Sequence, residues 1–352
     1  MIGATAAVRG DGSRPTGRAR DHGHDHQGAS CNTPPLNTEQ TLIPQQNQIV
    51  IDWLEFTLKN EDFRLRSYER LAKLIDIEGA SFRPADRGLH GYRKQVLYGK
   101  VRFLMDGNEN MGVHVILSGE AIRQMRADIL SLLEWVLHEG GTVSRIDLAL
   151  DDVTGNLTLS RVKRAVRSGA VSCRAKEYRQ MKKGNLSTGT VTGETFYFGS
   201  AQSRTQYRIY DKAAERGIEG HWVRCEGQYR NENAHLVAHM INEASLNVGR
   251  VYCGLLRGFL NFLIPSSTDT NKARWKTAAW WLDLLNDAEK LKLSVTKPEP
   301  SLERSAKWLE KQVAPTIAML LDGYGVPYLE QIYREGKRRM TPEQRELSAI
   351  PF

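Results

Sequence analysis

Three segments in the middle of the chain alternate apolar with polar or charged residues: SRIDLALDD (144–152), TQYRIYDK (205–212) and HWVRCEGQYR (221–230). Because side chains on a strand point to opposite faces at every second residue, each segment predicts a strand with one strongly polar face. On those faces we expect Arg145, Asp147 and Asp151 from the first segment, Gln206, Arg208, Tyr210 and Lys212 from the second, and Trp222, Arg224, Glu226, Gln228 and Arg230 from the third.

Further patterns surround these segments. β-rich runs at 48–58, 91–105, 112–117 and 195–198 predict additional strands. Ser118 precedes a stretch with apolar residues at helical spacing that ends at Gly140 and Gly141, which predicts one helix. Other helices are expected near 158–169, 234–246, 272–285 and 301–321. Strands with interspersed helices indicate an α+β fold.

The composition limits the class of protein. The chain has 352 residues, of which 40% are hydrophobic and 26% charged, and a net charge of +8, as expected of a mildly basic globular protein. We expect no membrane-spanning helix and no secretory signal peptide, and hence a cytoplasmic protein. The four cysteines form no CxxC pair, which disfavours a disulfide framework and a zinc knuckle.

Changes in composition along the chain predict three regions. Residues 1–45 are polar and poor in apolar side chains, and we expect them to form a disordered arm. Residues 46–265 would form the α+β domain, which contains the three polar strand faces. Residues 266–352 would form a helical C-terminal region.

Aligned in one sheet, the three polar faces would combine carboxylates, a tyrosine hydroxyl and cations. Carboxylate oxygens are the ligands that Mg²⁺ or Mn²⁺ prefers, and such a metal ion polarises a phosphate. Arg208 and Lys212 are suited to binding the non-bridging phosphate oxygens. Tyr210 lies between these two cations, and a phenol becomes a useful nucleophile only when its phenolate form is favoured. The set suits phosphodiester chemistry.

A basic segment lies beside these strands. Residues 161–183 have a net charge of +8, which favours binding to phosphates and predicts a steep dependence of DNA affinity on salt. The expected DNA-binding residues are Arg161, Lys163, Arg164, Arg167, Arg174, Lys176, Arg179, Lys182 and Lys183.

The chain resembles the replication initiation factors and related relaxases that start rolling-circle replication or transfer of plasmids, integrative elements and filamentous phages. SRIDLALDD is similar to the acidic strand of that family, residues 195–215 to its tyrosine hairpin, and VRCEGQYR (223–230) to its Arg-x-Glu strand. The resemblance implies a mainly antiparallel sheet with crossing helices, a degenerate form of the rolling-circle nuclease core.

The resemblance also implies a DNA nicking-closing strand transferase that becomes linked through tyrosine to a 5′ phosphate and leaves a free 3′ hydroxyl. Tyr210 takes the nucleophile position, and Asp147 and Glu226 match the acidic positions that bind Mg²⁺ or Mn²⁺. The third ligand is Asp151, by strand alternation, or Asp152. Origin DNA is the expected substrate, a host helicase and polymerase are the expected partners, and a homodimer is one arrangement to test.

Three alternatives stay open. Tyr207 is a second choice of nucleophile if the strand is irregular. The same acids suit a metal-dependent endonuclease that activates water and forms no covalent link to DNA. A non-enzymatic origin-binding or regulatory protein would use only the basic segment and the C-terminal helices.

Overall fold

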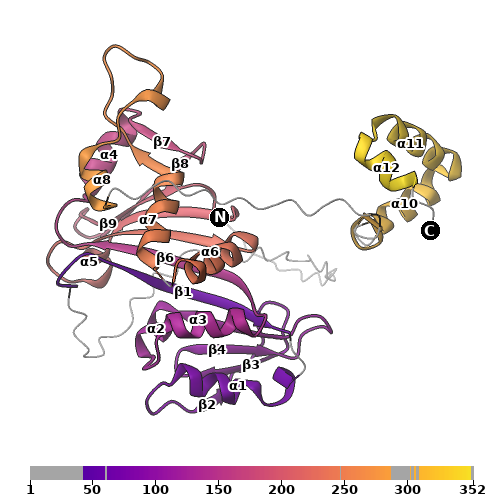
Figure 1. Cartoon of the computed structure of the whole chain (residues 1–352), viewed down its shortest axis with the longest axis horizontal. Helices are drawn as coiled ribbons and strands as arrows, with labels where there is room; N and C mark the ends of the chain where they lie inside the picture. Colours follow the sequence, from indigo (N-terminus) through magenta and orange to yellow (C-terminus); the bar gives the residue numbers. More distant parts are fainter. Residues whose placement is uncertain are drawn as a thin grey trace, which may run out of the picture. The chain divides into compact units, whose positions relative to one another are not determined.

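A ten-stranded sheet forms the framework of the protein (Figure 1). The computed structural model describes residues 43–59, 62–245, 247–286, 302, 305, 306 and 309–349. Neighbouring strands are antiparallel throughout the sheet, which confirms the predicted α+β fold with a mainly antiparallel sheet. In spatial order the strands are β2 (Phe82–Pro84), β3 (Lys94–Tyr98), β4 (Val101–Met105), β5 (Val113–Ser118), β1 (Gln48–Leu58), β6 (Thr142–Asp152), β11 (Val223–Arg230), β10 (Thr205–Asp211), β9 (Val191–Phe198) and β8 (Tyr178–Gly184).

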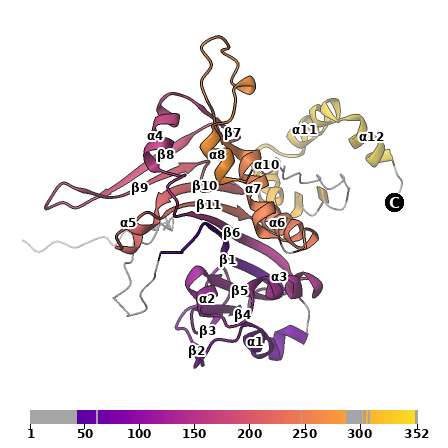
Figure 2. The ribbon, with the colours of Figure 1, turned by 60° about the vertical axis from the view of Figure 1, so that its left-hand side comes forward.

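Helices cover the apolar face of this sheet (Figure 2). The helices that accompany the sheet are α1 (Asp62–Ile75), α2 (Gly119–Gln124), α3 (Ile129–His138), α4 (Leu159–Arg167), α5 (Lys212–Arg216), α6 (Glu232–Glu243), α7 (Val248–Phe259) and α8 (Ala279–Leu284). Leu133 of α3, Val237 of α6 and Leu256 of α7 are fully buried in one cluster with Leu148 and Ile209 of the sheet. The alternation of apolar residues therefore decides which face is covered.

The helix predicted after Ser118 is two helices. Met125 leaves α2 in an extended conformation and bridges to Ile77. Asp128 then begins α3, because its side chain accepts a hydrogen bond from the backbone N–H of Ser131. A second capping residue inside the periodic stretch thus divides it.

The helix predicted over 272–285 is also interrupted. Lys272–Arg274 form a single 3₁₀ turn, and α8 begins at Ala279. Between them Thr277 bridges to Leu263, and the N–H of Ala278 donates to the carbonyl of Phe262. Strand-like pairing with the end of β12 (Leu260–Phe262), which itself pairs with β7 (Val171–Cys173), replaces the expected helical turn.

The described residues from 309 to 349 are mainly helical. A π-helical turn (Leu309–Val313) leads into α10 (Ala314–Tyr324), α11 (Val326–Arg339) and α12 (Pro342–Ala349). Gly325, with φ of 72°, separates α10 from α11. None of the described helices is long and apolar enough to span a membrane. The predicted arm lies outside the described residues, apart from 43–45.

Candidate active site

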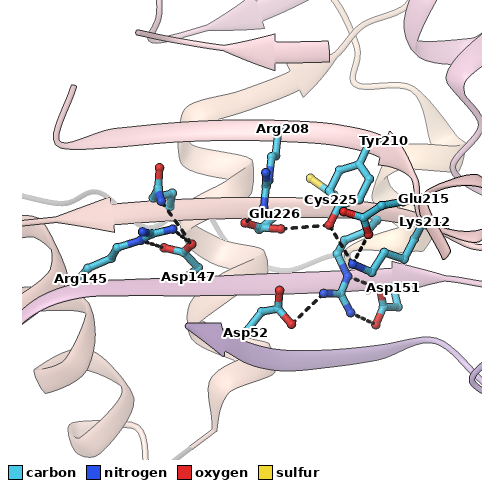
Figure 3. A network of polar contacts seen from close by, with 12 residues as sticks. Asp52, Arg145, Asp147, Asp151, Arg208, Tyr210, Lys212, Glu215, Cys225 and Glu226 are labelled. Atoms are coloured by element: carbon cyan, nitrogen blue, oxygen red, sulfur yellow. Dashed lines mark hydrogen bonds and ion pairs between the residues drawn. The ribbon is translucent and has the colours of Figure 1, made fainter. Parts of the chain in front are cut away.

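The register of the sheet brings the three polar strand faces together. β6 pairs with β11, and β11 pairs with β10, so that Asp151, Arg224 and Tyr210 lie directly opposite one another in one row. In the next row Glu226 lies between Ala149 and Arg208. The face alignment expected from alternation is therefore present in the structure (Figure 3).

Tyr210 lies at the centre of this face with its hydroxyl directed toward Glu226. The Oη atom donates a hydrogen bond to Oε2 of Glu226 at 3.2 Å, and Nζ of Lys212 lies 3.5 Å from Oη. The guanidinium of Arg208 and the ammonium of Lys212 lie 5.2 and 5.5 Å from the centre of the ring. Tyr210 thus has a carboxylate and two cations around one nearly buried phenol.

The surroundings of Tyr210 hold the phenol in its neutral form. Burial raises the pKa of Tyr210 well above its ordinary value, and the Glu226 charge adds to this, whereas the Arg208 charge opposes it. The pKa of Lys212 is lowered, chiefly by burial. A phenolate at this position therefore requires that the proton has a nearby acceptor when the oxygen reacts.

Short-range backbone structure fixes Lys212. Asp211 ends β10 and begins α5, because its side chain accepts from the N–H of Ala214. The N–H of Lys212 donates to the carbonyl of Trp222 at 2.7 Å. Its ammonium pairs with Glu215 one turn further along α5. The change from strand to helix directly after Tyr210 thus turns the Lys212 side chain back toward the phenol.

Asp147 and Glu226 form a buried acidic pair, and each is 2% exposed. Arg145 donates two hydrogen bonds to Asp147, at 3.0 and 2.6 Å, and Arg208 donates one to Glu226 at 2.6 Å. Burial raises the pKa of Asp147 to about 6, with Arg145 opposing the rise and the Glu226 charge adding to it.

The carboxylate of Asp151 is bound by side chains of three other residues. Arg224 donates to both of its carboxylate oxygens, at 2.6 and 2.8 Å, and Nε1 of Trp222 donates to Oδ1 at 2.7 Å. Gln48 adds a hydrogen bond to Oδ2 at 3.1 Å. Asp151 is fully buried, and its oxygens are occupied by these four donor groups, so its side chain anchors Arg224.

Asp152 and Tyr207 point away from the polar face. Asp152 bonds to His221 at 3.0 Å and accepts from the N–H of Leu157 at 2.8 Å. Tyr207 is fully buried among apolar residues and shares a hydrogen bond with Tyr229. Because β10 is regular at this point, its alternation keeps Tyr207 on the opposite side from Tyr210.

A cavity of about 200 Å³ opens beside the acidic pair and Tyr210. Its charged lining includes residues of β1, α2 and α5 as well as the three strands already described. The charged lining residues are Asp52, Glu120, Asp147, Glu215, Glu226, Arg123, Arg145, Arg208, Lys212 and Arg216. Such a lining accepts a charged ligand rather than an apolar one.

Asp52 is a cavity residue that the strand pattern does not reveal. It lies at a register shift between Ile51 and Trp53 of β1, and its Oδ1 lies 2.9 Å from Nη1 of Arg224. Burial opposes ionisation of Asp52, but the charges of Arg224, Lys212 and Arg123 and the hydrogen bond from Arg224 together outweigh it and lower the pKa of Asp52. The signal in the sequence is one acid within the apolar run IVIDWL (49–54), and alternation there does not predict the register shift.

Carboxylates at the cavity wall are the available ligands for a divalent cation. Among the described residues there is no group of three or more histidine, cysteine, aspartate or glutamate side chains arranged to hold a metal ion. Mg²⁺ is commonly bound through one or two carboxylates, with water and substrate phosphate as the remaining ligands. Asp147 and Glu226, two carboxylates at the wall of one cavity, fit that kind of site.

The basic segment is divided between two parts of the fold. Arg161, Lys163, Arg164 and Arg167 belong to α4, whose Val162 is buried in the apolar core with Ile209. Arg179, Lys182 and Lys183 belong to β8, the last strand of the sheet. Arg174 and Lys176 lie between β7 and β8. The charges of the segment thus come from a helix, a strand and the link that precedes the strand.

Comparisons with known proteins identify the family. Residues 141–330 match the model of the replication initiation factor family, and residues 48–135 match that of the N-terminal domain of rolling-circle replication initiation proteins. A protein of Bacillus subtilis (strain 168) with the name "Putative DNA relaxase NicK" is 22% identical over 313 residues, which cover 82% of this chain and 87% of that protein. The solved structure of the rolling-circle replication initiator protein from Geobacillus stearothermophilus is 28% identical and aligns with a TM-score of 0.64, covering 71% of this chain and all of that one. The chain therefore belongs to the replication initiation factor family.

Proposed function

We propose that the protein starts rolling-circle replication by nicking one DNA strand at an origin, with the Tyr210 oxygen as the nucleophile. The observation that carries this proposal is the hydrogen bond of 3.2 Å from the Tyr210 hydroxyl to Glu226, at the wall of a charged cavity. Family membership supports the same reaction class. In this proposal the nicking activity belongs to residues 46–265.

The proposed step is a transesterification. The bond from Oη of Tyr210 to phosphorus forms while the bond from phosphorus to the 3′ oxygen breaks. The phenol proton passes to Glu226, its hydrogen-bond acceptor, and the departing oxygen takes up a proton to become a 3′ hydroxyl. The 5′ phosphate stays on Tyr210.

Charge on the phosphate is stabilised by the cations around Tyr210. Arg208 and Lys212 are both within reach of the ring, and both line the cavity. Fixed cations in a site of low water content stabilise developing negative charge without reorganisation. Arg224, held by Asp151 and Asp52, lies next to Tyr210 across the sheet and adds a further fixed positive charge.

Asp147 and Glu226 are the residues that would hold a Mg²⁺ or Mn²⁺ ion. When bound, this ion would polarise the phosphate that Arg208 and Lys212 also contact. Asp151 is left out of the ligand set, because it is not among the residues that line the cavity.

Retention of the phosphodiester as a phosphotyrosine makes the reaction reversible. A 3′ hydroxyl that returns to the site can attack the phosphorus and release Tyr210, so closure needs no ATP. Between the two steps the free 3′ end would prime a host polymerase, and a host helicase would open the duplex.

The experiment compares Tyr210→Phe with Tyr207→Phe on supercoiled DNA that carries the element's own origin, in Mg²⁺ or Mn²⁺. We expect Tyr210→Phe to abolish nicking and Tyr207→Phe, on the other face of the same strand, to retain it. Nicking that persists in Tyr210→Phe would instead support hydrolysis by activated water. Specific DNA binding without nicking by the parent protein would support a non-enzymatic origin-binding protein.

A further inference from the structure

The polar face that carries Tyr210 continues beyond β10 to the edge of the sheet. Tyr197 of β9 lies opposite Arg208, and Arg179 of β8 lies opposite Tyr197. In the adjacent row Thr195 lies opposite Tyr210, and Met181 lies opposite Thr195. Because directly opposed residues share a face, these side chains extend the polar face outward from the cavity.

Arg179 and Tyr197 form a cation–π pair on this extension. The guanidinium carbon of Arg179 lies 4.7 Å from the centre of the Tyr197 ring. Tyr197 is only 8% exposed, whereas Arg179 is exposed. The guanidinium therefore lies over the ring, while the Arg179 side chain stays accessible to solvent.

Lys183 lies on the same face, closer to the turn that connects β8 with β9. It lies opposite Gly193, and a Cβ built on Gly193 would be 3.8 Å from Cβ of Lys183. Because Gly193 has no side chain, the side chain of Lys183 is the main side-chain surface at this position of the polar face. Met181, between Arg179 and Lys183 along the strand, is 44% exposed.

The other face of β8 has a different arrangement. Lys182 lies opposite Glu194, and its Nζ is 3.9 Å from Oε1 of that residue. Gln180 donates to the same glutamate. Two neighbouring lysines of one strand thus point to opposite faces, one paired with an acid and one beside a glycine.

We propose that single-stranded DNA next to the nick runs from Tyr210 across β9 to β8, where a base stacks on Arg179 and a phosphate contacts Lys183. The proposal rests on the proposed function for the identity of the strand. β8 lies two strand spacings from β10, or about 10 Å, so the track begins immediately beside the reacting phosphate. Stacking on an Arg guanidinium requires a base whose face is exposed, which selects a single strand over a duplex.

The test measures binding without cleavage, so its result does not depend on the nicking mechanism. The full chain in EDTA is titrated by fluorescence anisotropy into three labelled probes: a 12-nucleotide oligothymidine, an abasic strand of the same length, and a 12-base-pair duplex. Arg179→Ala is expected to weaken oligothymidine binding by about 5- to 150-fold, the range expected for the loss of one stacked base. The loss on the abasic strand should be much smaller.

Lys183→Ala and Lys182→Ala form the matched pair. Each removes one lysine from the same strand, and only Lys183→Ala is expected to weaken binding of both single strands. Arg179→Lys, which keeps the charge but not the plane, should lose most of the preference for oligothymidine over the abasic strand. Equal losses for Lys182→Ala and Lys183→Ala, an Arg179→Ala effect of the same size on the abasic strand, or tighter binding of the duplex would each overturn the proposal.

Discussion

The hydroxyl of Tyr210 and the carboxylate of Glu226 are hydrogen-bonded at 3.2 Å although the two residues lie on different strands and are not directly opposed in register. Arg208, which is directly opposite Glu226, binds the other carboxylate oxygen. One oxygen of Glu226 is thus held by a cation, and the other is directed at the phenol. Glu226 therefore has one oxygen in position to accept the proton of Tyr210.

Glu226→Gln should reduce nicking at least about 100-fold, because the amide accepts no proton from Tyr210. Binding of uncleaved origin DNA should persist, since the substitution preserves size. Nicking rates and DNA affinity are measured on the same preparation. Glu232→Gln, on an exposed glutamate that pairs with Arg204, is the control and should behave like the parent. An unchanged nicking rate in Glu226→Gln would remove Glu226 from the mechanism.

Asp147 should make folding stability depend on pH. Its folded pKa of about 6 is above its ordinary value of 3.8, so its contribution is fully present below about pH 4 and is lost as the pH rises through 6. Asp147→Asn removes this titration. The free energy of unfolding of the variant, relative to the parent, should therefore rise by up to about 3 kcal/mol from about pH 4 to about pH 7. Urea unfolding at several pH values measures it, and a difference that is independent of pH would contradict the assignment.

Arg224 links Asp151 and Asp52 in a buried ion cluster. Arg224→Met would leave two carboxylates near each other without their cation, and should lower the free energy of unfolding by about 3 to 5 kcal/mol. The control is Arg274→Met, which breaks an exposed pair with Asp269 and should change stability much less. If urea unfolding shows that both substitutions lower the free energy of unfolding by a similar small amount, the cluster does not stabilise the fold.

The exposed arginines of α4 should contribute to DNA affinity through phosphates. Arg164 and Arg167 are three residues apart and lie on one side of the helix. Replacing both by alanine should reduce the slope of log affinity against log salt concentration by up to about 1.8 for duplex DNA, with no change in sequence preference. A slope equal to that of the parent would exclude α4 from the DNA interface.

Alternation in the sequence was sufficient to predict the polar face of the site. The segments around Asp147, Tyr210 and Glu226 are regular strands, so the period of two predicts which side chains meet once the strands are neighbours. The order of the strands itself is a tertiary property that the alternation does not contain.

Other features depend on tertiary contacts that local patterns do not contain. Asp52 reaches the cavity only because β1 has a register shift, and Asp151 is engaged by Arg224 and Trp222 from the neighbouring strand. The sequence indicated β8 only as part of a basic segment. Polar residues lie on both faces of this strand, so no alternation of apolar and polar residues marks it as a strand. The cation–π pair of Arg179 and Tyr197 was therefore not predictable from the sequence.

The most direct measurement of the central claim is the identification of the residue that becomes attached to DNA. The protein is incubated with supercoiled origin DNA and Mg²⁺ or Mn²⁺, the complex is digested with protease and nuclease, and the peptide that carries a nucleotide is sequenced by mass spectrometry. We predict a 5′-phosphotyrosine at Tyr210 and a 3′ hydroxyl at the nick. A nick without any attached peptide, or an attachment at another tyrosine, would contradict the account.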